Sequence, residues 1–280
     1  MKAEAQDRGL LASLVAGSER RAAAARGERG DLERRAAGAS APPDLGTALT
    51  AGPAVAVIAE IKRKSPSAGA LWREDDVAEL ARRLEAGGAA ALSVLTEPER
   101  FAGSLADLAS AAGAVRIPVL RKDFVVDPVQ LLEARAHGAA AVLLIARILE
   151  PARLADLVGE ARRLGLATLV EVHAAAELAP ALAAQPSAVG LNARDLDTLT
   201  MNRGLVEELI RLVPAGRIAV AESGLAARAD VEQVAQAGAD AVLIGAAIAG
   251  AADPAAALAA LTRVPRRSGA RAAPGRGRPA

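Results

Sequence analysis

Between residues 55 and 245 the chain repeats one pattern: a short apolar run, a loop, and a segment of Ala, Leu, Arg and Glu with helical spacing. The eight runs are VAVIAE (55–60), AAALSVL (89–95), IPVLRK (117–122), AAVLLIA (140–146), ATLVEV (167–172), AVGLN (188–192), RIAVAE (217–222) and ADAVLIG (239–245). Continuous rather than alternating apolar character indicates strands that are covered on both faces. Eight such strands, each followed by room for one helix, predict an α/β fold, a closed (β/α)8 TIM barrel.

The segments on either side of the repeat differ from it. Residues 1–48 contain helical stretches separated by RGERGD and GASAPPD, and we expect them to form a helical extension that packs on the barrel. The barrel itself is assigned to residues 49–262. Residues 263–280 are rich in Pro, Gly and Arg and have no apolar periodicity, which predicts a disordered basic tail.

Composition excludes several classes of protein. The chain has no Cys, so disulfides and thiolate metal sites are excluded and a reducing cytoplasm is the expected compartment. Its two histidines, His137 and His173, are too far apart in sequence to predict a metal centre. We expect both to be structural, although His173 shares a strand face with Glu171.

Charge and hydropathy exclude some classes of binding partner. The longest apolar run, AAAVLLIA (139–146), is too short to cross a bilayer, so no membrane partner is expected. Formal net charge is +1, and the tail holds six Arg and no acid, so the rest of the chain carries −5. A general nucleic-acid surface is therefore not predicted.

Polar residues gather where the predicted strands end, which is where barrels of this class build their active sites. They are Glu60, Lys62 and Ser65 at the end of the first run and just beyond it, Arg121, Lys122 and Asp123 at the end of the third, Glu171 in the fifth, Asn192 and Arg194 at the end of the sixth, and Glu222 and Ser223 at the end of the seventh. A buried charge costs several kcal/mol unless it is paired. One such residue is compatible with a simple ion pair at the barrel end, but the whole set predicts a shared catalytic cavity.

The loops after the seventh and eighth strands suggest a phosphate site. Barrels commonly bind phosphate there, because glycine lets backbone N–H groups approach the anion. Gly224 in SGL (223–225) and Gly245 in IGAAI (244–248) occupy these loops. Ordinary turn chemistry also accounts for the two glycines, so the residues alone leave both interpretations open.

Eight longer segments carry the pattern of a known family. They are EIKRKSPSAGAL (60–71), GGAAALSVLTEPERFAGS (87–104), PVLRKDF (118–124), LLIARIL (143–149), LVEVH (169–173), GLNARDL (190–196), AESGL (221–225) and LIGAAI (243–248). In this order they resemble the indole-3-glycerol phosphate synthase family, and the resemblance runs from residue 8 to residue 262. That family also has a helical N-terminal extension, which corresponds to residues 8–48.

The resemblance implies a reaction without metal or organic cofactor. Family members convert 1-(2-carboxyphenylamino)-1-deoxyribulose 5-phosphate to indole-3-glycerol phosphate in tryptophan biosynthesis, with loss of carbon dioxide and water. By similarity, Lys122 is the principal general acid, Glu171 is the general base, and Lys62 binds the substrate carboxylate and shares in acid catalysis. The supporting residues are Glu60 and Glu222 around the lysines, and Asn192 and Arg194 around the substrate. Crowding of Lys62, Lys122 and Arg194 is expected to lower the pKa of a lysine.

The resemblance also implies binding groups. Those for the phosphate are Ser65, Ser223, Gly224, Gly245 and the backbone of Ala246. Those for the aromatic ring are Phe101, Phe124, Leu143 and Ile244, although rim packing explains the last two equally well. Relatives often carry Ser or another polar residue where this chain has Ala246, and loss of one neutral hydrogen bond costs about 1 kcal/mol at most.

Three alternatives stay open at this point. One is another phosphate-binding barrel, such as the isomerase that precedes this step in the pathway; its reaction favours an Asp/Cys pair, and this chain has no Cys. Another is a non-catalytic phosphate-binding barrel, and the last is a paralogue that performs the same chemistry in a specialised indole pathway. In each case the partner is a small phosphorylated molecule. We expect a monomer, with a dimer as the alternative.

Overall fold

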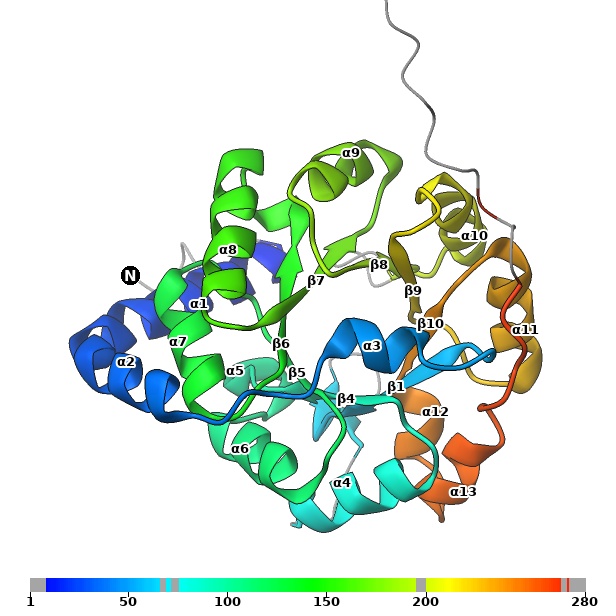
Figure 1. The fold of residues 1–280 in the computed structure, drawn as a ribbon, viewed down its shortest axis with the longest axis horizontal. Helices are drawn as coiled ribbons and strands as arrows, with labels where there is room; N and C mark the ends of the chain where they lie inside the picture. Colours follow the sequence, from blue (N-terminus) through cyan, green and yellow to red (C-terminus); the bar gives the residue numbers. More distant parts are fainter. Residues whose placement is uncertain (1–8, 66–68, 72–75, 195–199, 268–270, 272–280) are drawn as a thin grey trace, which may run out of the picture.

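The computed structural model describes residues 9–65, 69–71, 76–194, 200–267 and 271. Eight strands form a closed, all-parallel barrel in the order β1-β10-β9-β8-β7-β6-β5-β4 (Figure 1). Their bounds are β1 Ala56–Ile61, β4 Ala91–Leu95, β5 Val119–Lys122, β6 Ala141–Ile145, β7 Ala167–Val172, β8 Ala188–Asn192, β9 Ile218–Glu222 and β10 Ala241–Ile244. The predicted TIM barrel is confirmed, and each predicted run contains most of one barrel strand.

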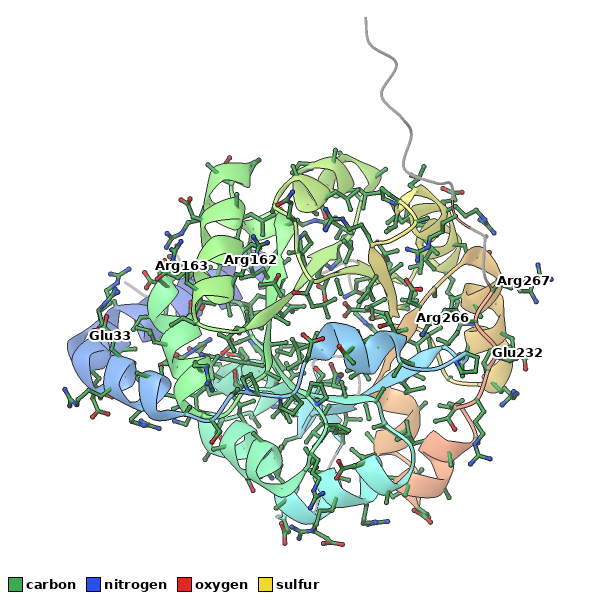
Figure 2. The ribbon with its side chains drawn as sticks, in the orientation of Figure 1. Glu33, Arg162, Arg163, Glu232, Arg266 and Arg267 are labelled. Atoms are coloured by element: carbon green, nitrogen blue, oxygen red, sulfur yellow. The ribbon has the colours of Figure 1, made fainter. Side chains whose placement is uncertain are left out.

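Helices surround the barrel on the outside (Figure 1). They are α4 Val77–Ala86, α5 Pro98–Phe101, α6 Leu105–Ala114, α7 Pro128–Ala136, η2 Ala146–Ile148, α8 Pro151–Arg163, α9 Ala175–Ala183, α10 Arg203–Leu212, α11 Arg228–Ala237, α12 Ala246–Ala249 and α13 Pro254–Ala259. Charged side chains such as Arg163 and Glu232 project outward from this layer (Figure 2). Within the described residues, no helix is long and apolar enough to span a membrane.

Alternate residues of each strand build two separate cores. On β1, Val57 and Ala59 belong to the large core between the strands and the outer helices, whereas Ile58 belongs to the core inside the barrel. Small and branched aliphatic side chains fill the interior, and it becomes polar only at the carboxyl ends of the strands, where Glu60 and its neighbours begin. This two-residue period decides which polar residues reach the cavity.

The N-terminal extension consists of α1 (Leu10–Ala25), η1 (Arg26–Glu28), α2 (Arg29–Gly38) and α3 (Leu45–Thr50). In Figure 1, α2 lies beside α7 at the edge of the barrel. Leu45 and Leu49 of α3 are fully buried in the inner core, and α3 contacts β1, β4 and β9. The extension therefore contributes to the barrel core as well as to its outer surface.

One structural element is absent from the sequence prediction. A short antiparallel pair, β2 (Lys64–Ser65) and β3 (Gly69–Ala70), forms in the loop that follows β1. Two-residue strands carry no periodic signal, which explains why they were not predicted.

The first tail residues contact the barrel. Pro265 forms a bridge with Ala54, and Arg271 lies 2.6 Å from the Asp240 carboxylate. Residues 268–270 and 272–280 lie outside the described residues, so for them disorder stays a prediction.

Candidate active site

A cavity of about 290 Å³ opens at the carboxyl ends of the barrel strands. The predicted site residues that line it are Glu60, Lys62, Ser65, Phe101, Lys122, Phe124, Leu143, Glu171, Asn192, Arg194, Ser223, Gly224, Ile244, Gly245 and Ala246. Glu222 reaches the cavity through its contact with Lys122. The structure thus brings the whole predicted set together, although its members span most of the chain.

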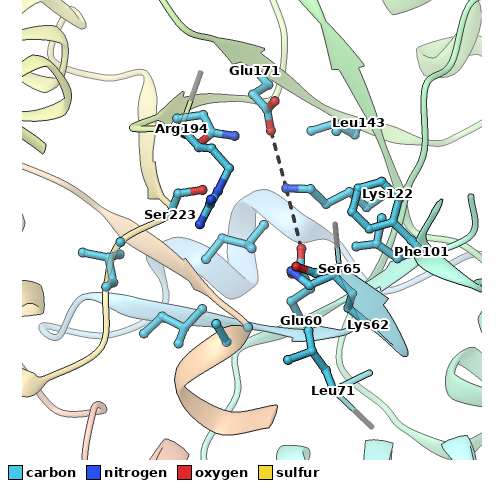
Figure 3. Close-up of a pocket in the computed structure, with 18 of the residues that line it drawn as sticks. Glu60, Lys62, Ser65, Leu71, Phe101, Lys122, Leu143, Glu171, Arg194 and Ser223 are labelled. Carbon is cyan, nitrogen blue, oxygen red and sulfur yellow. Dashed lines mark hydrogen bonds and ion pairs between the residues drawn. The ribbon is translucent and has the colours of Figure 1, made fainter. Parts of the chain in front are cut away.

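Lys122 is the centre of the polar part of the cavity. Its Nζ lies 2.9 Å from Glu222 Oε2, 3.4 Å from Glu171 Oε2 and 3.7 Å from Glu60 Oε2. Figure 3 draws the contacts of Lys122 with Glu171 and Glu60. These glutamates come from β1, β7 and β9, and all three are buried. Lys62 in turn donates a hydrogen bond to Glu60 Oε1. Three carboxylates and two ammonium groups therefore share one site.

Two glycines make room for the carboxylates. A Cβ on Gly190 would lie 2.1 Å from Glu222 Oε1, and a Cβ on Gly245 would lie 2.5 Å from Glu60 Oε1. Any side chain at these positions would push the carboxylates away from Lys122. Gly190, in the middle of β8, was not among the predicted site residues, because glycine in a strand does not reveal which side chain fills its space.

The expected decrease in lysine pKa is wrong for Lys122. Burial alone lowers the pKa of this ammonium group, but the charges of Glu222, Glu171 and Glu60 outweigh burial and raise it above its ordinary value. The sequence prediction considered the neighbouring cations and underestimated the carboxylates. Lys122 therefore holds its proton firmly in the free protein.

In this cluster, the group that gains or loses a proton near neutral pH is a glutamate and not a lysine. Burial raises the pKa of Glu222 to about 8, reinforced by the charge of Glu171. Burial also acts to raise the pKa of Glu171, but the charge of Lys122 and a contact with His173 outweigh it and hold that pKa well below its usual range. Glu171 is consequently ionised at neutral pH while Glu222 carries a proton.

Burial also opposes ionisation of Glu60, but the nearby charges of Lys62 and Lys122 hold its pKa below the ordinary value. Asn192 accepts a hydrogen bond from the backbone N–H of Arg194 at 2.9 Å, which fixes the strand end beside the cavity. Arg194 is drawn in Figure 3 next to Ser223.

The predicted phosphate side consists of the two loops after β9 and β10. Ser223 and Gly224 both have positive φ, 67° and 71°, so the backbone turns sharply after Glu222. Gly245 is the N-cap residue of α12, and Ala246 is its first residue. The left-handed conformation of Ser223 is costly for a residue with a side chain, and such strain is typical of functional loops.

Arg203 is a cation beside these loops that the predicted set lacks. It lines the cavity, and its Nε lies 3.1 Å from the position that a Cβ on Gly224 would take. Its Nη1 donates a hydrogen bond to Asp230 at 2.8 Å. In the sequence, Arg203 lies in the segment TMNRGL (200–205), and nothing in that segment shows that the side chain turns toward the cavity.

The apolar side of the cavity comes partly from the N-terminal extension. Phe101, Phe124 and Leu143 line it as predicted, and Leu10 and Leu14 of α1 join them. Leu10 and Leu14 are spaced i, i+4 and therefore share one helix face. Their spacing was visible in the sequence, but the surface that this face contacts was not.

Metal ligands are not clustered in the part of the chain that the structure describes: no group of three His, Cys, Asp or Glu side chains could hold an ion there.

Fold and site together define a class: TIM-barrel enzymes in which lysines and glutamates surround a cavity beside glycine-containing loops at the strand carboxyl ends. A model of one family, indole-3-glycerol phosphate synthase, matches residues 11–261. The chain belongs to the indole-3-glycerol phosphate synthase family.

Curated relatives agree with this assignment. An indole-3-glycerol phosphate synthase of Parafrankia sp. is 52% identical over 223 residues, which cover 80% of this chain and 83% of the relative. Those of Mycobacteroides abscessus and Mycobacterium ulcerans are 49% and 46% identical, covering 82% and 90% of this chain and 84% and 93% of the relatives.

Solved structures with low sequence identity share the fold alone. A thiamine phosphate pyrophosphorylase of Pyrococcus furiosus is 16% identical with a TM-score of 0.58, covering 78% of this chain and 96% of its own. A mutant tryptophan synthase α-subunit from the same organism is 14% identical with a TM-score of 0.57, covering 74% and 97%.

Proposed function

We propose that this protein catalyses the closure of 1-(2-carboxyphenylamino)-1-deoxyribulose 5-phosphate to indole-3-glycerol phosphate, as a carboxy-lyase of tryptophan biosynthesis. Family membership over residues 11–261 supports the reaction. The single observation that carries the mechanism is Lys122, held among three buried glutamates on the cavity floor. No observation favours an isomerase, a specialised pathway or a non-catalytic binding protein.

The acid of this reaction is Lys122 together with Glu222. The ring carbon that bears the carboxylate attacks the substrate ketone, and the ketone oxygen must receive a proton as the carbon–carbon bond forms. Lys122 donates to that oxygen, and the proton on Glu222, whose pKa is raised to about 8, is available to replace the one transferred. An acid with a pKa near the working pH is the most effective donor.

The base is Glu171. After carbon dioxide leaves, the oxygen that was protonated departs as water, and the methylene carbon bonded to the arylamine nitrogen loses a proton, so that the indole double bond forms. Glu171 is ionised at neutral pH because its pKa is lowered, and its Oε2 faces the cavity beside Lys122. Lys62, paired with Glu60, is placed to bind the substrate carboxylate before it is lost.

The remaining residues bind the substrate. The phosphate lies at the loops of Ser223–Gly224 and Gly245–Ala246, where backbone N–H groups donate, and Ser65 and Arg203 add polar contacts. The aromatic ring lies against Phe101, Phe124, Leu143 and Ile244. Asn192 and Arg194 position the substrate hydroxyls and ring. Ala246 contributes a backbone donor and no hydroxyl.

We also propose that the protein is a cytoplasmic monomer that requires no metal or organic cofactor, with its catalytic barrel at residues 49–262, its helical extension at 1–48 and a basic tail from 263.

The test is an assay of purified protein with the carboxyphenylamino-deoxyribulose phosphate, following indole fluorescence. The parent should turn over, and Lys122→Ala should lose two or more orders of magnitude in kcat, about the contribution of a general acid. Circular dichroism establishes that the variant is folded. A parent that binds the substrate without turnover would support a binding protein, and a Lys122→Ala variant as active as the parent would refute the assignment of the acid.

A further inference from the structure

His173 follows β7 directly, and its side chain is only 1% exposed. We expected it to pack as a structural residue. Its two ring nitrogens are buried and make no aligned hydrogen bond within the described residues. Burial of such polar atoms is unfavourable, and an apolar side chain would fill the same space without that cost. A packing role alone therefore does not explain an imidazole here.

Carboxylates lie on both sides of the ring. Nε2 is 3.1 Å from Glu171 Oε1, and Nδ1 is 3.9 Å from Glu177 Oε2. Glu177 is itself held, because its Oε2 accepts the backbone N–H of His173 at 2.7 Å and its Oε1 accepts from Arg147 Nε at 2.9 Å. The ring is thus placed between an anchored carboxylate and the carboxylate assigned as the base.

We propose that His173 is a positioning residue: through Nε2 it holds Glu171 Oε1, so that Glu171 Oε2 is directed toward Lys122 and the substrate. The proposal deepens the proposed function and rests on it where catalysis is concerned. His173 does not line the cavity and is not expected to touch the substrate.

The contact has an electrostatic consequence. The close contact of the ring with Oε1 lowers the pKa of Glu171 and so favours its ionised form, which keeps the proton shared by the two acids on Glu222. The charged groups that surround this pair are Lys122 and Glu60 from the cavity, Glu222 from β9, and Glu177 with Arg147 behind the ring. Without His173, the pKa of Glu171 should rise toward its ordinary value.

The chain offers a matched control, because it has only two histidines. His137 follows α7, and its ring contacts Arg35 Nη2 and the carbonyl of Glu133, away from the cavity. The variants are His173→Phe, His173→Gln and His137→Gln. Glutamine retains a hydrogen-bond donor that does not titrate, whereas phenylalanine retains the bulk alone.

In steady-state assays His173→Phe should lose about 10- to 100-fold in kcat, the usual effect of removing a partner that orients a reactive group, with KM little changed. The acidic limb of its kcat/KM profile should move to higher pH, because Glu171 then takes up a proton more readily. His173→Gln should recover most of kcat, and His137→Gln should match the parent. Equal losses of kcat in both His173 variants, with the pH profile of the parent, would show that His173 acts through packing alone.

A binding-independent measurement separates this proposal from the proposed function. With ¹⁵N-labelled histidine, only two imidazole spin systems are present. Glu171→Gln should shift the signals of His173 and leave those of His137 unchanged, whether or not the protein turns over the substrate. Unchanged His173 signals would overturn the contact itself. Shifted signals in a protein without turnover would retain the contact and refute the function.

Discussion

Arg121 and Lys122 are neighbours on β5, yet they are the centres of two opposite kinds of ionic cluster. Arg121 points outward, and its guanidinium is bound on every side. Nη2 lies 3.1 Å from Asp123 Oδ2, Nη1 donates to the Gln130 carbonyl at 2.7 Å and to Glu133 at 3.0 Å, and Nε donates to Thr96. Lys122 points inward to the cavity.

The two clusters differ in how completely their charges are matched. Asp123 pairs with Arg121 and also with Arg21 of α1 at 3.1 Å, and these two cations outweigh burial and hold the pKa of Asp123 below its ordinary value. Around Lys122 three glutamate side chains meet only two lysines, and Glu222 Oε1 has no hydrogen-bond partner in the described structure. Every nitrogen of the Arg121 guanidinium donates a hydrogen bond, and a group held in this way fixes the structure around it. A carboxyl oxygen without a partner beside a cavity is available for chemistry.

The largest expected effect tests the cluster around Arg121 and Asp123, the structural cluster. Arg121→Met should lower the free energy of unfolding by about 3–5 kcal/mol, because it leaves buried carboxylates without their cation. Urea unfolding at neutral pH measures the change. The control is Arg82→Met, which removes an exposed pair with Glu79 and should cost about 1 kcal/mol or less. Similar losses in both variants would contradict the assignment of Arg121 to a buried, matched network.

The next effect tests the Lys122 cluster, for which we propose the catalytic role, through the backbone that accommodates it. Gly190→Ala places a Cβ where Glu222 Oε1 lies, so the carboxylate must move away from Lys122. We expect kcat to fall about 100-fold, the effect of misplacing a catalytic group by roughly 1 Å. Gly113→Ala, on the exposed face of α6 with open space around it, should leave kcat unchanged. Parental kcat in Gly190→Ala would show that the position of Glu222 does not matter.

A third prediction uses pH. Glu222 has a pKa of about 8 in the folded protein against about 4.5 when unfolded, so between these values the folded state holds a proton that the unfolded state lacks. Its contribution to stability is therefore complete below pH 4.5 and is lost as pH rises toward 8. The slope is at most about 1.4 kcal/mol per pH unit. Urea unfolding between pH 5 and 8 should show a shallower decline for Glu222→Gln than for the parent, and equal slopes would contradict the raised pKa.

The barrel was predictable because its signal is repeated eight times. Each run of β-branched and aliphatic residues identifies a strand, and strand ends in a closed parallel barrel must meet at one rim. Lys62 and Lys122 could be assigned to one cavity from this rule alone. The N-terminal helices were predicted as an extension, but their apolar faces do not say that Leu14 reaches the cavity while Leu49 enters the inner core.

The electrostatics could not be predicted, because they depend on distances. Whether a lysine pKa rises or falls is decided by a few ångströms between one Nζ and several carboxylates, and a sequence does not contain these lengths. The space beside Gly190 and the direction of the His173 ring are also properties of packing. The most consequential errors therefore concern charge balance, where three carboxylates outweigh the cations expected to dominate.

The smallest expected effect concerns Arg203. Its pairing is intermediate between that of Arg121, which is fully paired, and that of Lys122, which faces the cavity. Its Nη1 is matched by Asp230, as in the structural cluster, while its Nε faces the Gly224 loop beside the cavity. Because the side chain is 56% exposed, solvent weakens its attraction for a phosphate. Arg203→Ala should raise KM about five- to tenfold and leave kcat unchanged, as loss of one charged hydrogen bond reduced by exposure predicts.

Arg211→Ala, on the same helix, 54% exposed and paired with Glu207, is the control and should leave KM unchanged. Inorganic phosphate as a competitive inhibitor measures the same contact without the aromatic part of the substrate. Equal inhibition constants for the two variants would place Arg203 with the matched, structural pairs.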